Sequence, residues 1–225
     1  MKTEKRSSGS AAIDALIGGG LELRTITQIY GEPASGKSTL CMIAAVSCLR
    51  AGHPVIYIDS EGFSIERFRQ IAGEDTEKLA EHLFLFEPLD FEHQGTMITE
   101  AEKVLKAHKP GLLVMDSATA LYRTDLEKGR DALQALTKQM IHLLGYCKRY
   151  EIPVIITNQV YMDTVKNTFY GLGGVALEHL SKVIIRLEKT DTPGVRRARL
   201  VKHRSRPEGA TISFEIVEEG VRVKD

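Results

Sequence analysis

The chain has 225 residues, and its 30 basic and 30 acidic side chains give a formal net charge of zero at pH 7. This balance excludes a polyanion-binding role that rests on overall charge, so such a role needs a local basic patch. Three cysteines without paired spacing exclude a disulfide framework and a zinc site. The start of the chain is polar and no apolar run approaches the roughly 18 residues of a membrane span, so we expect a cytoplasmic protein without a membrane partner.

The first predicted strand, Thr25–Tyr30, leads into a glycine-rich loop. A helix is predicted to follow from Ser38 to Arg50, with its clearest periodicity over Leu40–Leu49. The loop fits the pattern Gly-x-x-x-x-Gly-Lys-[Ser/Thr], in which backbone N–H groups close around phosphate oxygens. The strand and the helix on either side bring those phosphates to a helix N-terminus with its free N–H groups. The alternative is a glycine-rich turn without a ligand.

The predicted nucleotide-binding residues form one continuous segment. In this segment Lys37 reaches the β- and γ-phosphates, and the Ser38 hydroxyl holds Mg²⁺. The full set is Gly31, Glu32, Pro33, Ala34, Ser35, Gly36, Lys37, Ser38 and Thr39. The sequence therefore predicts a site for a nucleoside triphosphate.

Two carboxylates follow the second predicted strand, Val55–Asp59. Asp59 and Glu61 are two residues apart, so they share one face if the strand continues. Hydrolysis of a triphosphate requires a base that orients water against the γ-phosphorus, and we predict that Glu61 is this catalytic base. The alternative is that Glu61 only caps a helix that begins near Ser64.

Two further strand ends carry polar side chains. The strand Leu112–Asp116 brings Asp116 to the position of a second Mg²⁺ contact, unless it is simply a capping aspartate. The strand Val154–Thr157 leads to Gln159. We predict that its amide binds the γ-phosphate and reports the loss of this group to the following loop; a solvated glutamine is the alternative.

Short apolar runs alternate with longer amphipathic ones along the chain. The remaining predicted elements are the strands Leu83–Phe86 and Lys182–Leu187, the helices Phe91–Ala107 and Leu133–Arg149, and the C-terminal strands Arg199–Lys202, Thr211–Val217 and Val221–Val223. This order predicts an α/β fold with a mainly parallel twisted sheet, helices on both faces and an antiparallel C-terminal edge. Ligands of such sheets gather at the carboxyl ends of the strands.

Three segments resemble the RecA-like recombinases of archaea and eukaryotes: Tyr57-Ile-Asp-Ser-Glu-Gly62, Asp116-Ser-Ala-Thr-Ala-Leu-Tyr-Arg-Thr-Asp125 and Thr157-Asn-Gln-Val160. The similarity covers residues 10 to 225, with the motifs in the family's order, and it implies a RecA-like P-loop NTPase core that binds ATP with Mg²⁺. Only about twenty residues precede the first strand. We therefore expect a single RecA-like ATPase domain over residues 1–225, without the helical DNA-binding domain that precedes the full recombinase core.

The resemblance gives Glu61 and Gln159 the same roles as the strand-end argument. It also implies that an arginine after the glutamate stacks on adenine, which points to Arg67. The spacing between Glu61 and Arg67 is one residue shorter than is usual in the family, and a surface salt bridge is the alternative role of Arg67.

The resemblance further implies two DNA-binding loops, at residues 122–130 and 160–174. The candidate DNA-binding residues are Arg123, Lys128 and Arg130 in the first loop and Tyr161 and Lys166 in the second. Aromatic faces with scattered cations in a glycine-containing loop suit single-stranded DNA, because stacking tolerates any base. The alternative is an active-site lid that does not touch DNA.

A third basic element extends over residues 196–206, and the overlapping segment Lys202-His-Arg-Ser-Arg-Pro-Glu-Gly209 resembles the short archaeal paralogues of the strand-exchange protein RadA. In an extended strand Lys202 and Arg204 share a face. They are candidates for trans-acting fingers that reach the γ-phosphate of a neighbouring subunit, or for a basic patch on the DNA backbone. A solvated charged hairpin is the alternative.

The family joins subunits through a Phe-x-x-Ala segment, and none of the seven phenylalanines here is followed by alanine at the third position. We therefore expect weak self-association at most and slow ATP hydrolysis. The leading hypothesis is an ATP-binding and DNA-binding accessory protein of homologous recombination and DNA repair, with weak ATPase activity, that assists or regulates the main recombinase RadA. The alternatives are an active strand-exchange recombinase and a KaiC-like signalling ATPase.

Overall fold

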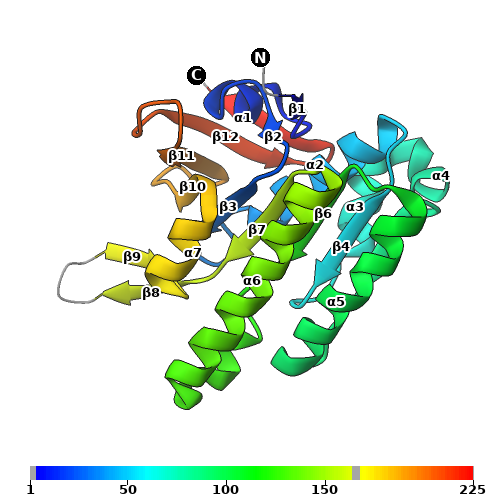
Figure 1. Cartoon of the computed structure of the whole chain (residues 1–225). Helices are drawn as coiled ribbons and strands as arrows, with labels where there is room; N and C mark the ends of the chain where they lie inside the picture. Colours follow the sequence, from blue (N-terminus) through cyan, green and yellow to red (C-terminus); the bar gives the residue numbers. More distant parts are fainter. Residues whose placement is uncertain (1–3, 164–167, 225) are drawn as a thin grey trace.

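The computed structural model describes residues 4–163 and 168–224. Its centre is a sheet of nine strands in the order β13-β12-β11-β10-β3-β7-β6-β4-β5 (Figure 1). The strands of this sheet are β3 (Ile26–Gly31), β4 (Val55–Asp59), β5 (Leu83–Phe86), β6 (Leu112–Asp116), β7 (Val154–Asn158), β10 (Ser181–Lys189), β11 (Val195–His203), β12 (Thr211–Val217) and β13 (Gly220–Lys224).

The sheet is parallel from β10 to β5 and antiparallel from β10 to β13. This arrangement confirms the predicted parallel sheet with an antiparallel C-terminal edge. The parallel strands read as nearly continuous apolar runs because helices cover both of their faces. Every residue of β4, β6 and β7 is buried, for example.

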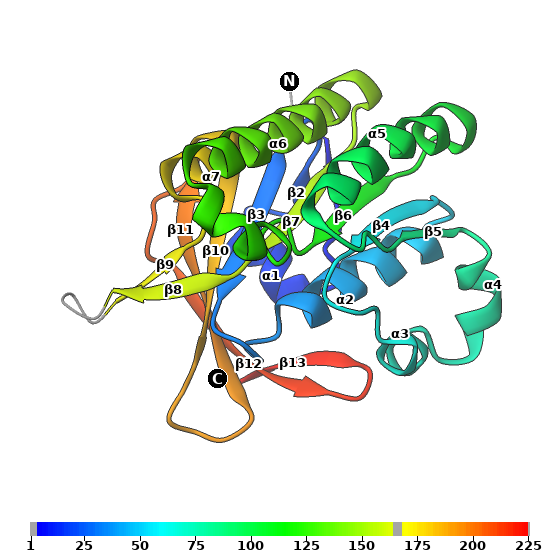
Figure 2. The same cartoon turned by 90° about the horizontal axis from the view of Figure 1, so that it is seen from below.

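Helices pack on both faces of the sheet (Figure 2). α1, α2, α3 and α4 share one apolar core with the sheet, whereas α5, α6 and α7 share the other. The helical elements are α1 (Ala11–Leu16), α2 (Lys37–Arg50), α3 (Ile65–Ala72), α4 (Thr76–Ala80), α5 (Phe91–His108), α6 (Arg130–Tyr150), α7 (Gly174–Leu180) and the 3₁₀ helices η1 (Gly73–Asp75) and η2 (Tyr122–Lys128). Within the described residues, none of the helices has the length and apolarity needed to cross a membrane.

Local sequence explains why the long helices form where they do. In α6 the buried residues Leu136, Met140, Leu143 and Cys147 recur every three or four positions, which is the spacing of one helix face. α5 begins after Asp90, whose carboxylate accepts a hydrogen bond of 2.7 Å from the main-chain N–H of His93. These signals fix the helices that support the carboxyl ends of the central strands.

Two small sheets were not predicted from the sequence. β1 (Lys5–Arg6) pairs with β2 (Leu21–Glu22), and β8 (Val160–Asp163) pairs with β9 (Thr168–Gly171). The first has two residues in each strand, which is too short to give an alternating pattern. The second turns part of the predicted loop at 160–174 into a hairpin, which projects from the body of the molecule beyond α7 (Figure 1).

Candidate nucleotide-binding site

The glycine-rich loop lies where β3 ends and α2 begins. Gly36 has a φ of 98° at the N-terminus of α2, and a Cβ added there would lie 3.1 Å from Cδ1 of Ile216. A Cβ on Gly31 would collide with the main-chain carbonyl oxygen of Leu187. Both positions therefore require glycine, and the loop keeps a cradle that a side chain would fill.

A cavity of about 550 Å³ lies over this loop. Its size falls within the usual range of small-molecule sites, roughly 300–1,000 Å³. Its walls include the predicted base Glu61 and six of the predicted nucleotide-binding residues, Pro33, Ala34, Gly36, Lys37, Ser38 and Thr39. Of the remaining predicted residues, Ser35 is fully buried beneath the loop.

Lys37 is held by the loop itself. Its Nζ donates to the main-chain carbonyl oxygens of Gly31 and Glu32, each at 3.0 Å. Burial lowers the pKa of Lys37, while the carboxylates of Glu61 and Asp116 oppose this shift. The two carbonyls are neutral acceptors, whereas phosphate oxygens carry a negative charge, so Coulomb attraction makes them better partners for this ammonium.

Two carboxylates lie at neighbouring strand ends, because Asp59 and Asp116 are paired in the β4–β6 register. Asp116 is 2% exposed and accepts hydrogen bonds from the hydroxyls of Tyr57, at 2.9 Å, and Thr157, at 2.6 Å. Burial raises the pKa of Asp59 to about 6, although the N–H of Gly62, 2.7 Å from its carboxylate, opposes the shift. The strand ends therefore concentrate negative charge beside the loop.

The residues at this edge fit a magnesium ion that arrives with a nucleotide. Among the described residues there is no group of three or more His, Cys, Asp or Glu side chains arranged to hold a metal on their own. Mg²⁺ in phosphate sites usually keeps several waters and needs only one or two protein ligands beside the phosphates. The predicted ligands are the Ser38 hydroxyl, at the start of α2 and on the cavity wall, and the Asp116 carboxylate, which is buried at the end of β6; their binding of Mg²⁺ stays a prediction.

The predicted base and the predicted γ-phosphate sensor are in direct contact. Nε2 of Gln159 donates to Oε1 of Glu61 at 2.9 Å. Glu61 does not cap the following helix, because the side chain of Ser64 does so by accepting from the N–H of Arg67 at 3.1 Å. The sequence placed these two residues at separate strand ends, and the sheet order brings them together.

Gln159 is also fixed at the root of the β8–β9 hairpin. Its main-chain N–H donates to Oγ1 of Thr119 at 3.0 Å, and its carbonyl accepts from the N–H of Leu172 at 2.9 Å. The Thr119 hydroxyl in turn donates to Oδ1 of Asn158 at 2.8 Å. The backbone of Gln159 is therefore part of the hydrogen-bonded base of the hairpin.

Arg67 contacts the C-terminal edge of the sheet rather than the cavity over the loop. It does not line the cavity over the loop. Its guanidinium instead donates to main-chain carbonyls of the turn between β12 and β13, namely those of Val217 at 2.8 Å, Glu218 at 2.9 Å and Gly220 at 3.0 Å. The arginine therefore ties α3 to the C-terminal edge, which is also not the surface salt bridge of the alternative. Adenine stacking by Arg67 stays a prediction.

The first predicted DNA-binding loop forms η2 and the start of α6. Arg123, Lys128 and Arg130 are all exposed there. Lys128 forms an ion pair of 2.7 Å with Asp125, so part of its charge is neutralised locally. The loop thus presents cations, and their contact with DNA stays a prediction.

The second predicted DNA-binding loop contains the β8–β9 hairpin. Tyr161 is 51% exposed, and its ring stacks on that of Tyr170 with a centroid distance of 5.9 Å. Lys166 lies outside the described residues. An exposed tyrosine stacked on a half-buried one, on a projecting hairpin, is suited to stacking with bases.

The basic C-terminal segment is bound largely within the chain. β11 ends at His203, so Lys202 and Arg204 do not share a strand face as expected. Nζ of Lys202 donates to the carbonyl of Glu178 at 2.5 Å, whereas Nη2 of Arg204 lies 2.7 Å from Oε2 of Glu22. The two predicted fingers therefore contact different elements, and a role of either in trans or on DNA stays a prediction.

Sequence reasoning missed three residues of the cavity wall, namely Gly194, Arg196 and Ile216. Arg196 and Ile216, from β11 and β12, complete the cavity on the side of the antiparallel edge. Figure 2 shows β12 and β13 beside the chain that joins β3 to α2. No local signal marks Arg196 or Ile216, because the former is one of several cations in a basic run and the latter is one of several apolar strand residues.

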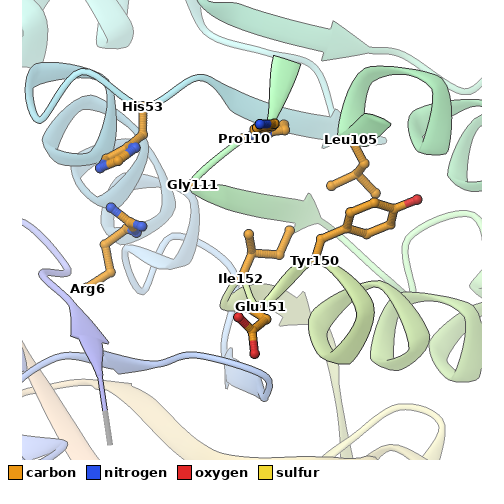
Figure 3. Close-up of a pocket in the computed structure, with 9 residues that line it drawn as sticks. Arg6, His53, Leu105, Pro110, Gly111, Tyr150, Glu151 and Ile152 are labelled. Carbon is orange, nitrogen blue, oxygen red and sulfur yellow. The ribbon is translucent and has the colours of Figure 1, made fainter. Parts of the chain in front are cut away.

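A second cavity, of about 540 Å³, lies at the opposite end of the parallel strands. Figure 3 shows Arg6 and His53 pointing toward one another, with Tyr150 and Leu105 on another side. His53 precedes β4 and Ile152 precedes β7, so this cavity adjoins the amino ends of the strands. Ligands of parallel sheets bind at the carboxyl ends, which favours the cavity over the glycine-rich loop as the nucleotide site.

Comparison with known proteins gives one family. The Rad51 family model matches residues 3–224. DNA repair and recombination protein RadB of Methanoculleus marisnigri is 65% identical to this chain over 224 residues, which cover 99% of both chains. RadB of Methanococcoides burtonii is 44% identical over 227 residues, which cover 99% of this chain and 100% of that protein. A solved structure described as the RadB recombinase superposes with a TM-score of 0.83 at 38% identity, covering 96% of this chain and 97% of the other. The chain, with its RecA-like sheet, therefore belongs to the Rad51 family.

Proposed function

We propose that this protein binds ATP with Mg²⁺ and single-stranded DNA, and that it acts in the cytoplasm as an accessory protein of homologous recombination and DNA repair. In this role it assists or regulates the main recombinase RadA. Membership of the Rad51 family and the names of its RadB relatives support the recombination and repair setting. The observation that carries the proposal is the hydrogen bond between Glu61 and Gln159, because it connects the wall of the loop cavity with the root of the β8–β9 hairpin.

The loop cavity supports ATP as the ligand. When bound, ATP supplies the γ-phosphoryl group, and its Mg²⁺ neutralises part of the phosphate charge. Lys37 then exchanges the loop carbonyls for phosphate oxygens, and the main-chain N–H groups at the start of α2 bind the same oxygens. Glu61, on the cavity wall, orients a water molecule and accepts its proton.

The contact between Glu61 and Gln159 supports coupling to DNA. A γ-phosphate near Gln159 competes with Glu61 for the amide group, since both are anionic acceptors. The same residue is bonded through its main chain to Thr119, which lies three residues before the first candidate DNA-binding loop, and to Leu172, which directly follows β9. Nucleotide state and the position of the two candidate DNA-binding loops are therefore linked in the proposed mechanism.

Slow hydrolysis is part of the proposal. A trans-acting arginine that stabilises the transition-state charge accelerates hydrolysis by roughly 10³–10⁵-fold in other P-loop proteins. The two candidates for this role, Lys202 and Arg204, are held by Glu178 and Glu22 of their own chain. Release of these contacts would have to precede any action on a neighbouring subunit, which favours a weak ATPase that responds mainly to nucleotide binding.

The proposal is tested by single-stranded DNA binding, measured by fluorescence anisotropy with and without Mg-ATP. Tyr161→Ala should weaken binding about 5- to 150-fold, which corresponds to a stacking contribution of roughly 1–3 kcal/mol. Arg130→Ala and Lys166→Ala should weaken it and reduce its salt dependence. Lys148→Ala is the matched control, because Lys148 is exposed at the far end of the same helix as Arg130. Wild-type affinity in all three loop variants would refute the DNA-binding loops.

A second candidate function is an active strand-exchange recombinase, which the description of the solved relative as a recombinase favours. Vigorous DNA-stimulated ATP hydrolysis together with extended filaments on DNA would select this function. Sedimentation with ATP, with DNA and with both separates the two candidates, because the accessory role predicts binding without extended assemblies. Rings that form with ATP, without DNA affinity, would contradict both.

A further inference from the structure

The start of β11 brings a cation of the same chain to the glycine-rich loop. Gly194 and Arg196 line the loop cavity together with Ala34. We propose that Arg196 is a nucleotide-binding residue that contacts the phosphate groups in cis, from the antiparallel edge of the sheet. This inference rests on the proposed function above, because it requires a nucleotide in the loop cavity.

The contacts of Arg196 are those of a cation without a charged partner. Its Nε donates to the carbonyl oxygen of Ala34 at 3.1 Å, and its Nη1 donates to the carbonyl oxygen of Val195, also at 3.1 Å. Both acceptors are neutral, and within residues 4–163 and 168–224 Arg196 forms no ion pair with a carboxylate. Anionic oxygens in the cavity would therefore be stronger partners than the carbonyls that now hold this guanidinium.

Lys37 provides a direct comparison. Its ammonium also rests on carbonyl oxygens of the loop, those of Gly31 and Glu32. Lys37 and Arg196 thus both donate hydrogen bonds to neutral carbonyl oxygens of the same loop, although they are far apart in the sequence. The same exchange of carbonyl for phosphate that the proposed function assigns to Lys37 is available to Arg196.

The backbone around Arg196 is rigid enough to position it. Arg196 pairs with Phe214 in the β11–β12 register, and Phe214 is 1% exposed. Two residues further along β12, Ile216 packs toward Gly36 at the start of α2. The antiparallel edge is therefore packed against the loop, so Arg196 reaches the cavity from a fixed strand rather than from a free surface loop.

The geometry favours the phosphates over the base as the partner. A guanidinium matches two oxygens of a phosphate with two parallel N–H groups, whereas a nucleobase offers it mainly a stacking face. The carbonyl that Arg196 now contacts belongs to the loop segment that collects phosphate oxygens. The effect of the side chain should therefore depend on the phosphate groups of the ligand and should vanish for the nucleoside.

The test measures the affinities of Mg-ATP, Mg-ADP and adenosine by titration calorimetry and competition with a fluorescent ATP analogue. Arg196→Ala should weaken Mg-ATP binding about 10- to 100-fold, as expected for hydrogen bonds to a charged group, and should leave adenosine affinity unchanged. Arg196→Gln keeps a donor for the Ala34 carbonyl without the charge, and it should lose nearly as much affinity for ATP. Arg197→Ala is the matched control, because this neighbouring arginine is exposed on the same strand and does not line the cavity.

The outcomes separate this inference from the proposed function. If the folded wild-type protein binds no Mg-ATP, the proposed function is wrong and the inference falls with it. If wild type binds Mg-ATP and both Arg196 variants bind it as tightly as Arg197→Ala does, the inference alone is wrong. An equal loss of ATP and adenosine affinity in the Arg196 variants would also overturn it, because the contact would then involve the nucleoside.

Discussion

Arg204→Ala separates a structural role of the basic segment from a catalytic one. Glu22 lies in β2 with its side chain 4% exposed, and Nη2 of Arg204 is 2.7 Å from its carboxylate. Two other basic groups lie farther away, since Nζ of Lys5 and Nε2 of His203 are each 3.8 Å from Oε1 of Glu22. Burial lowers the pKa of His203, so this ring is neutral at pH 7 and above, and among the described residues Lys5 is the cation that remains near the carboxylate in the variant.

The expected loss of stability follows from this geometry. Removing one partner of a buried ion pair costs about 3–5 kcal/mol, because the other charge stays buried. Lys5 remains near Glu22, and the side chain of Arg204 is itself 47% exposed, so the loss should lie below that range. We expect a decrease in the free energy of unfolding of about 2–3 kcal/mol. For a chain of this size that corresponds to a melting temperature lower by about 4–12 °C.

Thermal and urea unfolding, followed by circular dichroism at pH 7.5, measure this effect. Lys202→Ala is the control on the same segment, since Nζ of Lys202 contacts one carbonyl, and its loss should cost less than about 1 kcal/mol. Glu22→Gln in the Arg204→Ala background should recover part of the stability, because it removes the uncompensated charge. The reasoning is refuted if Arg204→Ala and Lys202→Ala have the same melting temperature. It is also refuted if adding Glu22→Gln to Arg204→Ala does not raise the free energy of unfolding. Loss of ATP hydrolysis with unchanged stability would instead support a trans-acting finger.

Three further predictions concern the nucleotide site. Lys37→Ala should weaken Mg-ATP binding at least about 100-fold in calorimetry while the protein stays folded, because it removes the ammonium that neutralises the phosphates. Glu61→Gln should keep Mg-ATP affinity and slow single-turnover hydrolysis about 10²- to 10⁴-fold, and unchanged turnover would exclude Glu61 as the base. Asp59→Asn should alter the pH dependence of stability, because burial raises the pKa of Asp59 in the folded protein from its ordinary value of 3.8 to about 6. Between about pH 4 and pH 6 the folded protein keeps the Asp59 carboxyl protonated, whereas the unfolded chain has already released this proton. The free energy of unfolding of the wild type therefore falls as pH rises through this range, by at most about 3 kcal/mol, and stays low above pH 6. Urea unfolding at pH 4.5 and 7.5 should show this decrease in wild type and a smaller one in Asp59→Asn; equal decreases would contradict it.

The nucleotide loop and the central strands could be predicted because their signals are local. The bounds of β4, β5, β6 and β12 agree with the sequence-based prediction. Parallel strands whose two faces are both covered by helices appear in the sequence as uninterrupted apolar runs. The nucleotide loop needs glycine at the two positions where a side chain would meet Ile216 or Leu187. β11 is longer than predicted, running over Val195–His203, because basic side chains on its exposed positions hide the apolar alternation.

The contacts between distant segments could not be predicted in the same way. Arg204 pairs with Glu22, and Arg196 reaches Ala34, through packing of the antiparallel edge against the N-terminal elements and the loop. Neither pair leaves a periodic pattern, because each partner lies more than a hundred residues from the other. A run of cations in the sequence is consistent with DNA, a neighbouring subunit or the protein's own carboxylates. Only the fold shows that Arg204 neutralises a buried carboxylate.

In the proposed mechanism, the contact between Glu61 and Gln159 allows a slow ATPase to respond to its nucleotide. While the amide of Gln159 donates to Glu61, one oxygen of the carboxylate is occupied and is not free to accept a hydrogen bond from water. A γ-phosphate that draws this amide away frees Glu61 and, at the same time, shifts a residue whose main chain is bonded to Thr119 and Leu172. Because coupling between two binding sites is reciprocal, a hairpin held by DNA must change the affinity for ATP by the same factor as ATP changes the affinity for DNA. Binding alone therefore suffices for regulation in the proposed mechanism, and hydrolysis serves to reset the contact.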